Sequence, residues 1–110
     1  MKKVYNKLIR DKIPEIIIAA GETPKIRKLA KREFRIELKK KVLEEAKEMI
    51  GAKSKKDILN EIVDLQELLD WLVKEFKLSR RDIKKLQTEK NKKRGSFAKQ
   101  LFLIETKARK

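Results

Sequence analysis

The sequence predicts an all-α protein, and three observations support this fold class. Gly occurs 3 times and Pro 2 times in 110 residues, so few positions interrupt regular structure. The chain is rich in Leu, Ile, Lys and Glu, a composition typical of helical proteins. Apolar residues recur at helical spacing along its middle part. We therefore expect one all-helical domain that spans residues 1–110, with short extended segments near both termini.

The first expected helix is short and lies near the N-terminus. Pro14 suits the first turn of a helix, where its missing N–H group costs nothing. Gly21 favours helix termination, so we expect this helix to run from Pro14 to Ala20. The residues before it are expected to be extended. Glu22–Leu29, which contains Pro24, is expected to form a loop.

A second helix is expected from about Lys31 to Ile50, because this stretch contains no Gly or Pro. Its apolar stripe is formed by Phe34, Leu38, Val42 and Met49. Glu45 occupies the position in this stripe where an apolar residue is expected. A carboxylate on the inward side of a helix is costly unless a partner satisfies it. This position distinguishes Glu45 from the ordinary charged residues of a protein surface.

A third helix is expected from about Lys55 to Phe76, after a turn at Gly51–Lys53. Ser54 and Asp57 resemble a capping box at its start. Its apolar seam consists of Ile58, Ile62, Leu65, Leu69, Leu72 and Phe76. Glu61 borders this seam, and further apolar residues widen it. Because one neighbouring helix cannot cover so broad a stripe, we expect a third helix or, preferably, another subunit to pack on it.

A fourth, basic helix is expected from about Arg80 to Lys92, and Gly95 is expected to end the helical stretch. Ser79 and Asp82 resemble a second capping box. A short apolar segment follows and is expected to form a strand or an extended strap over the bundle; it contains Phe97, Leu101, Leu103 and Ile104. The residues from Thr106 to Lys110 are expected to be a frayed tail.

The charge and the missing residue types limit the possible functions. Lys and Arg number 32 against 17 Asp and Glu, for a net charge of +15. The chain has no Cys and no His, which excludes disulfides, zinc fingers and thiol or imidazole catalysis. No apolar run approaches the length of a membrane span or of a signal-peptide core, so we expect a cytoplasmic protein without membrane contact. The excess of cations fits nucleic acid, an anionic small molecule or a hot-growing source organism.

Two acidic signatures lie on the second and third expected helices. They are Glu45-x-x-Glu48 and Glu61-x-x-Asp64. Residues three apart share a helix face, so each signature presents two adjacent carboxylates. If the turn makes the helices antiparallel, all four converge, and a hard cation such as Mg²⁺ would neutralise their repulsion.

The alternative interpretation of the acidic signatures is surface ion pairing, which is common in a chain so rich in charge. Lys41 is spaced to pair with Glu45, and Lys47 with Glu44. Aromatic residues are scattered, so a stacking platform for nucleic acid is not expected. Trp71 and Phe97 are interpreted as core packing residues rather than as stacking partners for a base.

Three motifs together resemble a known family. The paired acidic signatures resemble the hallmark of the MazG-like all-α nucleoside triphosphate pyrophosphohydrolases. The opening Tyr5-Asn6-Lys7-Leu8-Ile9-Arg10-Asp11-Lys12-Ile13-Pro14-Glu15-Ile16-Ile17 is similar to that of one small subgroup related to phosphoribosyl-ATP pyrophosphohydrolases. Lys93-Arg94-Gly95-Ser96-Phe97 resembles the late K-R-G-G-F element of that subgroup, with Ser96 in place of the second Gly.

The resemblance implies a helical bundle completed by a homodimer or homotetramer. It also implies Mg²⁺-dependent cleavage of the α–β bond of a nucleoside triphosphate, with Mn²⁺ as a substitute metal. The matching metal ligands are Glu45, Glu48, Glu61 and Asp64, and Glu45 or Glu48 is the candidate catalytic base. Asp11 is expected either to position Arg10 or to contact the nucleotide. Phosphate contacts are expected from the basic residues of the flanking motifs: Lys7, Arg10, Lys12, Lys93 and Arg94. The alternative function is a non-catalytic basic helical protein that binds nucleic acid or a protein partner.

Overall fold

The computed structural model describes residues 1–109 and contains four helices in that range. They are α1 (Ile13–Ala19), α2 (Lys31–Gly51), α3 (Lys55–Glu75) and α4 (Arg80–Arg94). No strand is present among these residues, which confirms the all-α class. The contacts within the chain divide it into two compact units, Met1–Lys77 and Leu78–Lys110. None of the helices described combines the length and the apolar character that crossing a membrane requires.

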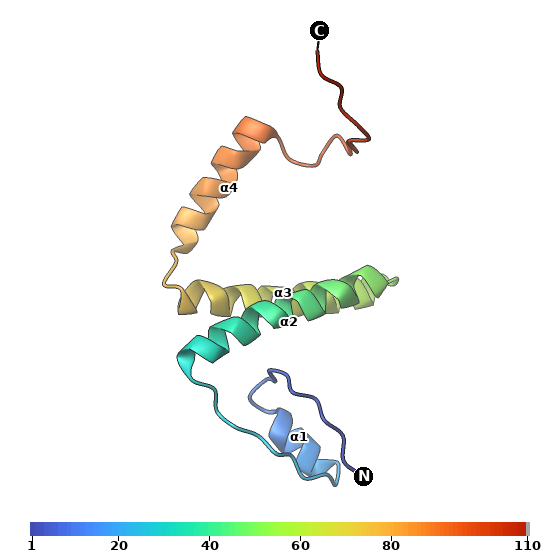
Figure 1. Ribbon diagram of the computed structural model, residues 1–110, viewed down its shortest axis with the longest axis vertical. Helices are drawn as coiled ribbons and strands as arrows, with labels where there is room; N and C mark the ends of the chain where they lie inside the picture. Colours follow the sequence, from blue (N-terminus) through green and yellow to red (C-terminus); the bar gives the residue numbers. More distant parts are fainter. Residues whose placement is uncertain (110) are drawn as a thin grey trace. The chain divides into compact units, whose positions relative to one another are not determined.

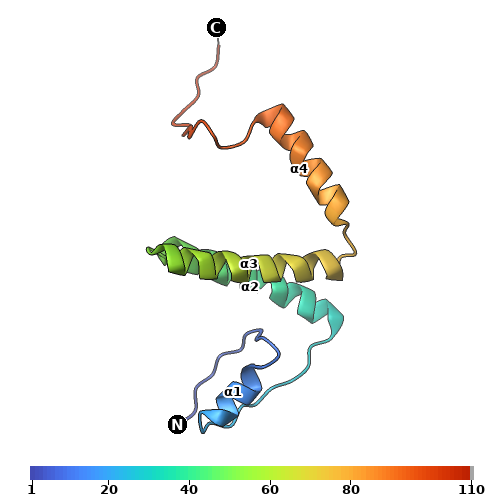
Figure 2. The same ribbon diagram turned by 180° about the vertical axis from the view of Figure 1, so that it is seen from behind.

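The N-terminal unit is built on a hairpin of two long helices, α2 and α3. The two helices lie side by side in the front view (Figure 1) and from behind (Figure 2). The short connection at residues 52–54 makes them antiparallel. Arg35, near the start of α2, confirms this direction because its Nε lies 3.4 Å from Oε1 of Glu75, the last residue of α3. The sequence therefore predicted the hairpin and both helices to within one residue at each end.

The interior of this unit is small. Leu38 of α2 is 2% exposed, and Leu68 of α3 is the other buried apolar residue among those described. Phe34 and Trp71 meet edge to face beside them, with ring centroids 6.0 Å apart. The packing interpretation of Trp71 is consistent with this contact. The stripe predicted for α2 faces inward, because Phe34, Val42 and Met49 are half-buried.

The helix ends follow the residues that cap them. The Ser54 and Ser79 side chains accept hydrogen bonds from the backbone N–H groups of Asp57 and Asp82, at 3.1 and 3.2 Å. Both predicted helix starts are thus confirmed. Pro14 lies in the first turn of α1, and the chain turns after Ala20 with Gly21 at φ +89°. That left-handed conformation favours Gly.

The C-terminal unit consists of α4 and the irregular residues that follow it. The helix α4 continues to Arg94, two residues beyond the predicted end. Gly95, at φ +81°, follows as its C-terminal cap. Residues 95–109 contain neither helix nor strand, so the predicted strand is wrong. Phe97 is 96% exposed, which also contradicts its interpretation as a core residue. Of the predicted tail, Lys110 lies outside the described residues.

Candidate metal centre

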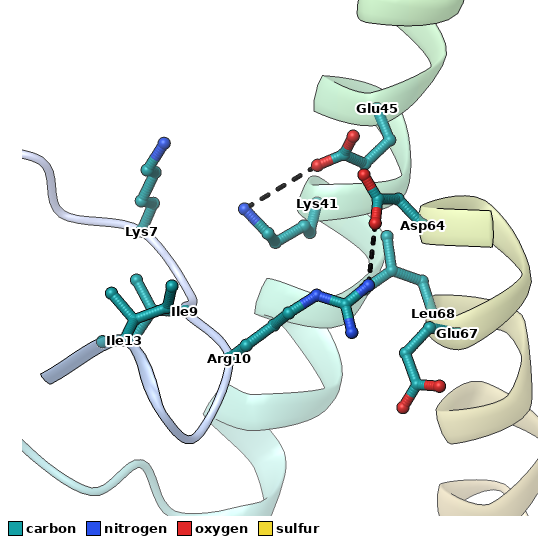
Figure 3. Close-up of a pocket in the computed structure, with 9 residues that line it drawn as sticks. All are labelled: Lys7, Ile9, Arg10, Ile13, Lys41, Glu45, Asp64, Glu67 and Leu68. Atoms are coloured by element: carbon teal, nitrogen blue, oxygen red, sulfur yellow. Dashed lines mark hydrogen bonds and ion pairs between the residues drawn. The ribbon is translucent and has the colours of Figure 1, made fainter. Parts of the chain in front are cut away.

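The antiparallel hairpin brings the two acidic signatures together around Glu45. Carboxylate oxygens of Glu45, Glu61 and Asp64 all lie within 4.8 Å of one another. A second group with the same spacing consists of Glu44, Glu45 and Glu48. Figure 3 shows the carboxylates of Glu45, from α2, and Asp64, from α3, directed toward each other. Glu45 belongs to both groups, and each of the other predicted residues, Glu48, Glu61 and Asp64, belongs to one of them.

Glu45 is the buried member of this cluster. Glu45 is 7% exposed, and its Oε2 atom is buried without a hydrogen-bond partner in the described structure. Oε2 of Glu61 is also buried without a partner. A buried oxygen without a partner destabilises the fold by about 1–3 kcal/mol, and more if it carries charge. Both oxygen atoms can therefore bind a cation or a proton, because no surrounding residue donates a hydrogen bond to them.

The protonation of Glu45 reflects this environment. Burial is the largest effect, and it raises the pKa of Glu45 from 4.5 to about 7. Hydrogen bonding with Glu61 and Glu48, and their negative charges, raise the pKa further in the same direction. Without a cation, the cluster therefore retains a proton up to neutral pH. A divalent ion would replace that proton and satisfy several oxygens at once.

Three cations surround the carboxylates. Nη2 of Arg10 lies 2.7 Å from Oδ1 of Asp64, although 54 residues separate them in sequence. Nζ of Lys41 lies 3.3 Å from Oε2 of Glu44 and 4.0 Å from Oε1 of Glu45. Lys7 completes the set, with its Nζ 3.3 Å from Oε1 of Glu44.

These cations affect Glu44 differently from Glu45. Partial burial alone would raise the pKa of Glu44, but the charges and hydrogen bonds of Lys41 and Lys7 lower it overall. Glu44 is thus an ionised, paired carboxylate, whereas Glu45 is not stabilised in its charged form. The sequence did not identify Glu44 or Lys41 as site residues. Their only signal is the spacing of Lys41, Glu44 and Glu48 on one helix face, which is common in a Lys- and Glu-rich helix.

A cavity of about 300 Å³ lies beside the cluster. Its wall combines the three cations with carboxylates and a few apolar side chains (Figure 3): Lys7, Ile9, Arg10, Ile13, Lys41, Glu45, Asp64, Glu67 and Leu68. The cavity volume suits a small ligand. Mixed charge of this kind fits an anion that arrives with a bound cation.

A second hollow, of about 240 Å³, has a different lining. It is lined by Glu48, Gly51, Ala52, Asp57, Asn60 and Glu61. Glu48 and Glu61 thus line this acidic hollow, whereas Glu45 and Asp64 line the first cavity together with the cations.

The remaining predicted residues lie elsewhere. Asp11 and Lys12 occupy an exposed turn just before α1 and do not line the cavity. Asp64, rather than Asp11, forms the ion pair with Arg10. Lys93 and Arg94 end α4, in the C-terminal unit.

Comparisons with protein-family models, curated proteins and solved structures find no match for this chain.

Proposed function

We propose that this protein is a Mg²⁺-dependent pyrophosphohydrolase that cleaves the α–β bond of a nucleoside triphosphate. One observation carries the proposal. Glu45 is buried with an unsatisfied oxygen among four further carboxylates, beside a cavity lined by Lys7, Arg10 and Lys41. The resemblance of the sequence motifs to the MazG-like family points to the same chemistry.

The donor set is suited to Mg²⁺. Magnesium prefers carboxylate oxygens and water, and it is commonly held by a few carboxylates together with substrate phosphates. Glu45, Glu61 and Asp64 supply oxygens at mutual distances within 4.8 Å and would hold the ion. When bound, Mg²⁺ would neutralise phosphate charge and lower the pKa of a coordinated water. Mn²⁺ has similar preferences and is expected to substitute.

The three cations of the cavity are assigned to the phosphates. Arg10 has a planar guanidinium group that binds two phosphate oxygens at once. In the described structure Arg10 pairs with Asp64, and with Asp64 holding the metal its guanidinium would be available to bind phosphate. Lys41 is only 16% exposed at its side chain, so its charge is shielded less by water than that of a surface lysine. Lys7 reaches the same cavity from the N-terminal segment.

A carboxylate of the cluster is assigned to the attacking water. Glu45 or Glu48 accepts its proton as the water attacks phosphorus in line with the departing pyrophosphate. Glu48 is exposed on α2, whereas Glu45 is buried and has its pKa raised to about 7. Glu45 lines the cavity that Lys7, Arg10 and Lys41 share and Glu48 does not, which favours Glu45.

We further propose that a second copy of the chain covers α3 and completes a homodimer or homotetramer. One side of α3 packs on α2, yet Ile58, Leu59, Ile62 and Leu69 remain 37–60% exposed. We call these four residues the outer apolar face of α3. So much apolar surface on one helix of a small unit is typical of a protein–protein contact. The identical helix of another copy offers the same apolar chemistry.

The enzymatic proposal is tested by pyrophosphate release. Ordinary and modified nucleoside triphosphates are incubated with Mg²⁺ and the wild-type protein, Glu45→Gln or Glu89→Gln. We expect turnover of at least one substrate and a loss of at least about 100-fold in Glu45→Gln, because a general base contributes about 10²–10⁴-fold. Glu89→Gln removes an equal charge from α4 and should retain activity. Absence of pyrophosphate release from every substrate would contradict the proposal.

The oligomer is tested by light scattering after size exclusion. Ile62→Lys places a charge on the outer apolar face of α3, where Ile62 is 48% exposed. Ile26→Lys, in the irregular segment before α2, is the matched control because Ile26 is 61% exposed. We expect the wild type and Ile26→Lys to be dimers or tetramers and Ile62→Lys to be a monomer. A monomeric wild-type protein would contradict the proposal.

A further inference from the structure

Several exposed cations of α4 form no ion pair in the part of the chain that the structure describes. Arg81, Lys84, Lys85 and Lys92 have no acidic partner among residues 1–109, and all four are exposed. Ion pairing within the chain therefore does not account for these charges. A cluster of exposed, unpaired cations attracts an external anion.

The arrangement of these cations on α4 is regular. Arg81, Lys84, Lys85, Thr88 and Lys92 are joined by steps of three or four residues, so they share one side of the helix. We call these five residues the basic face of α4. Asp82 and Glu89 border this face, at steps of three and four residues from Lys85. The face thus carries four cations and a hydroxyl group, with two carboxylates along one edge.

The length of the basic face exceeds that of a single phosphate group. Eleven residues separate Arg81 from Lys92, which corresponds to about 16 Å along the helix axis. Successive phosphates of one DNA strand advance by about 3.4 Å along the duplex. A row of cations over this length is suited to a polymer of phosphates rather than to one nucleotide.

We propose that the basic face of α4 binds the phosphate backbone of nucleic acid without sequence preference. Lys and Arg side chains provide such contacts, and they carry no information about base sequence. This activity is separate from the pyrophosphohydrolase site, which lies in the N-terminal unit.

An anionic membrane surface is the competing partner, and α4 is poorly suited to it. Ile83 and Leu86 are the apolar residues of this helix, so it has little apolar surface to insert among lipids. The most exposed apolar residues of this unit lie instead in the irregular segment after Gly95, with Phe102 89% exposed. Membrane binding would therefore depend on that segment and not on the basic face.

The proposal is tested with a short fluorescein-labelled DNA duplex of random sequence, followed by anisotropy at salt concentrations between about 50 and 200 mM. If the four cations contact phosphates, the logarithm of the binding constant falls with that of salt at a slope of about −4. Lys84→Gln/Lys92→Gln should weaken binding at least tenfold. It should also reduce the steepness of the salt dependence by about one for each lysine removed. Gln is a good helix former, so α4 should persist, which circular dichroism verifies.

Two further variants locate the effect. Lys25→Gln/Lys28→Gln removes the same charge from an exposed irregular segment and should bind like the wild type. Lys84→Arg/Lys92→Arg keeps the charge and should also retain binding. Equal losses in the two Gln double variants, or no binding by the wild type at low salt, would overturn the proposal. Binding to phosphatidylglycerol vesicles that is tighter than to DNA and is lost in Phe102→Ser would overturn it as well.

Discussion

The two units of this protein differ in how their basic side chains are paired. In Met1–Lys77, some basic residues pair with carboxylates of other segments, as Arg10 does with Asp64 and Arg35 with Glu75. In Leu78–Lys110, the basic face of α4 has no acidic partner among the described residues. The N-terminal unit encloses a buried carboxylate, whereas α4 contains no buried residue. The charged residues that give the net charge of +15 therefore lie in two different environments.

The largest expected difference between the units concerns packing. Leu38→Ala should destabilise the N-terminal unit by about 3 kcal/mol, because the lost side chain is buried and leaves a cavity. Leu86→Ala, on the half-exposed surface of α4, should cost less than about 0.5 kcal/mol. Urea unfolding followed by circular dichroism measures both values. Equal effects would mean that α4 is as well packed as the α2–α3 hairpin.

A second difference concerns pH. The pKa of Glu45 is about 7 in the folded chain and 4.5 in the unfolded reference. The folded state thus holds a proton more tightly, and this stabilisation is complete below pH 4.5 and lost as the pH rises through 7. The loss corresponds to about 3 kcal/mol.

Glu45→Gln isolates this effect because glutamine does not titrate. Metal-free Glu45→Gln should match the wild type near pH 4.5 and be more stable than it at pH 8, whereas Glu89→Gln on α4 should follow the wild type throughout. Thermal unfolding across this pH range, in a chelator, provides the measurement. Parallel wild-type and Glu45→Gln curves would show that burial does not perturb Glu45.

A smaller effect is expected for the cations of the cavity. Arg10→Lys keeps a positive charge but loses the paired donors, and Lys41→Gln loses the charge. Each should raise the KM for a triphosphate about tenfold, since a hydrogen bond to a charged group contributes about 1.5–3 kcal/mol. Steady-state kinetics beside Lys25→Gln, an exposed lysine outside the cavity, tests this. Unchanged KM values in both variants would show that the cavity does not bind the phosphates.

The helices and the inward position of Glu45 could be predicted because their causes are local. Serines cap α3 and α4, and the apolar stripe of α2 places Glu45 on the buried side. Lys41 and Glu44 could not be singled out, since many Lys and Glu residues of this chain have the same spacing. The partner of Arg10 depends on a contact across 54 residues, which one sequence does not encode in any local pattern.

The strand predicted after Gly95 was wrong because a strand depends on a partner elsewhere in the chain. Phe97, Leu101 and Ile104 have a composition suited to a strand or strap, but a strand requires a paired edge. Residues 1–109 contain no other strand to provide one.

The central claim is that the carboxylates around Glu45 hold a divalent cation, and isothermal titration with Mg²⁺ tests it most directly. The wild type and Glu89→Gln should show one saturable class of site. Glu45→Gln and Glu61→Gln should bind at least about tenfold more weakly, since loss of even an outer partner of a metal site costs about 10–100-fold. Absence of saturable Mg²⁺ binding by the wild type, or equal weakening in Glu89→Gln, would contradict the claim.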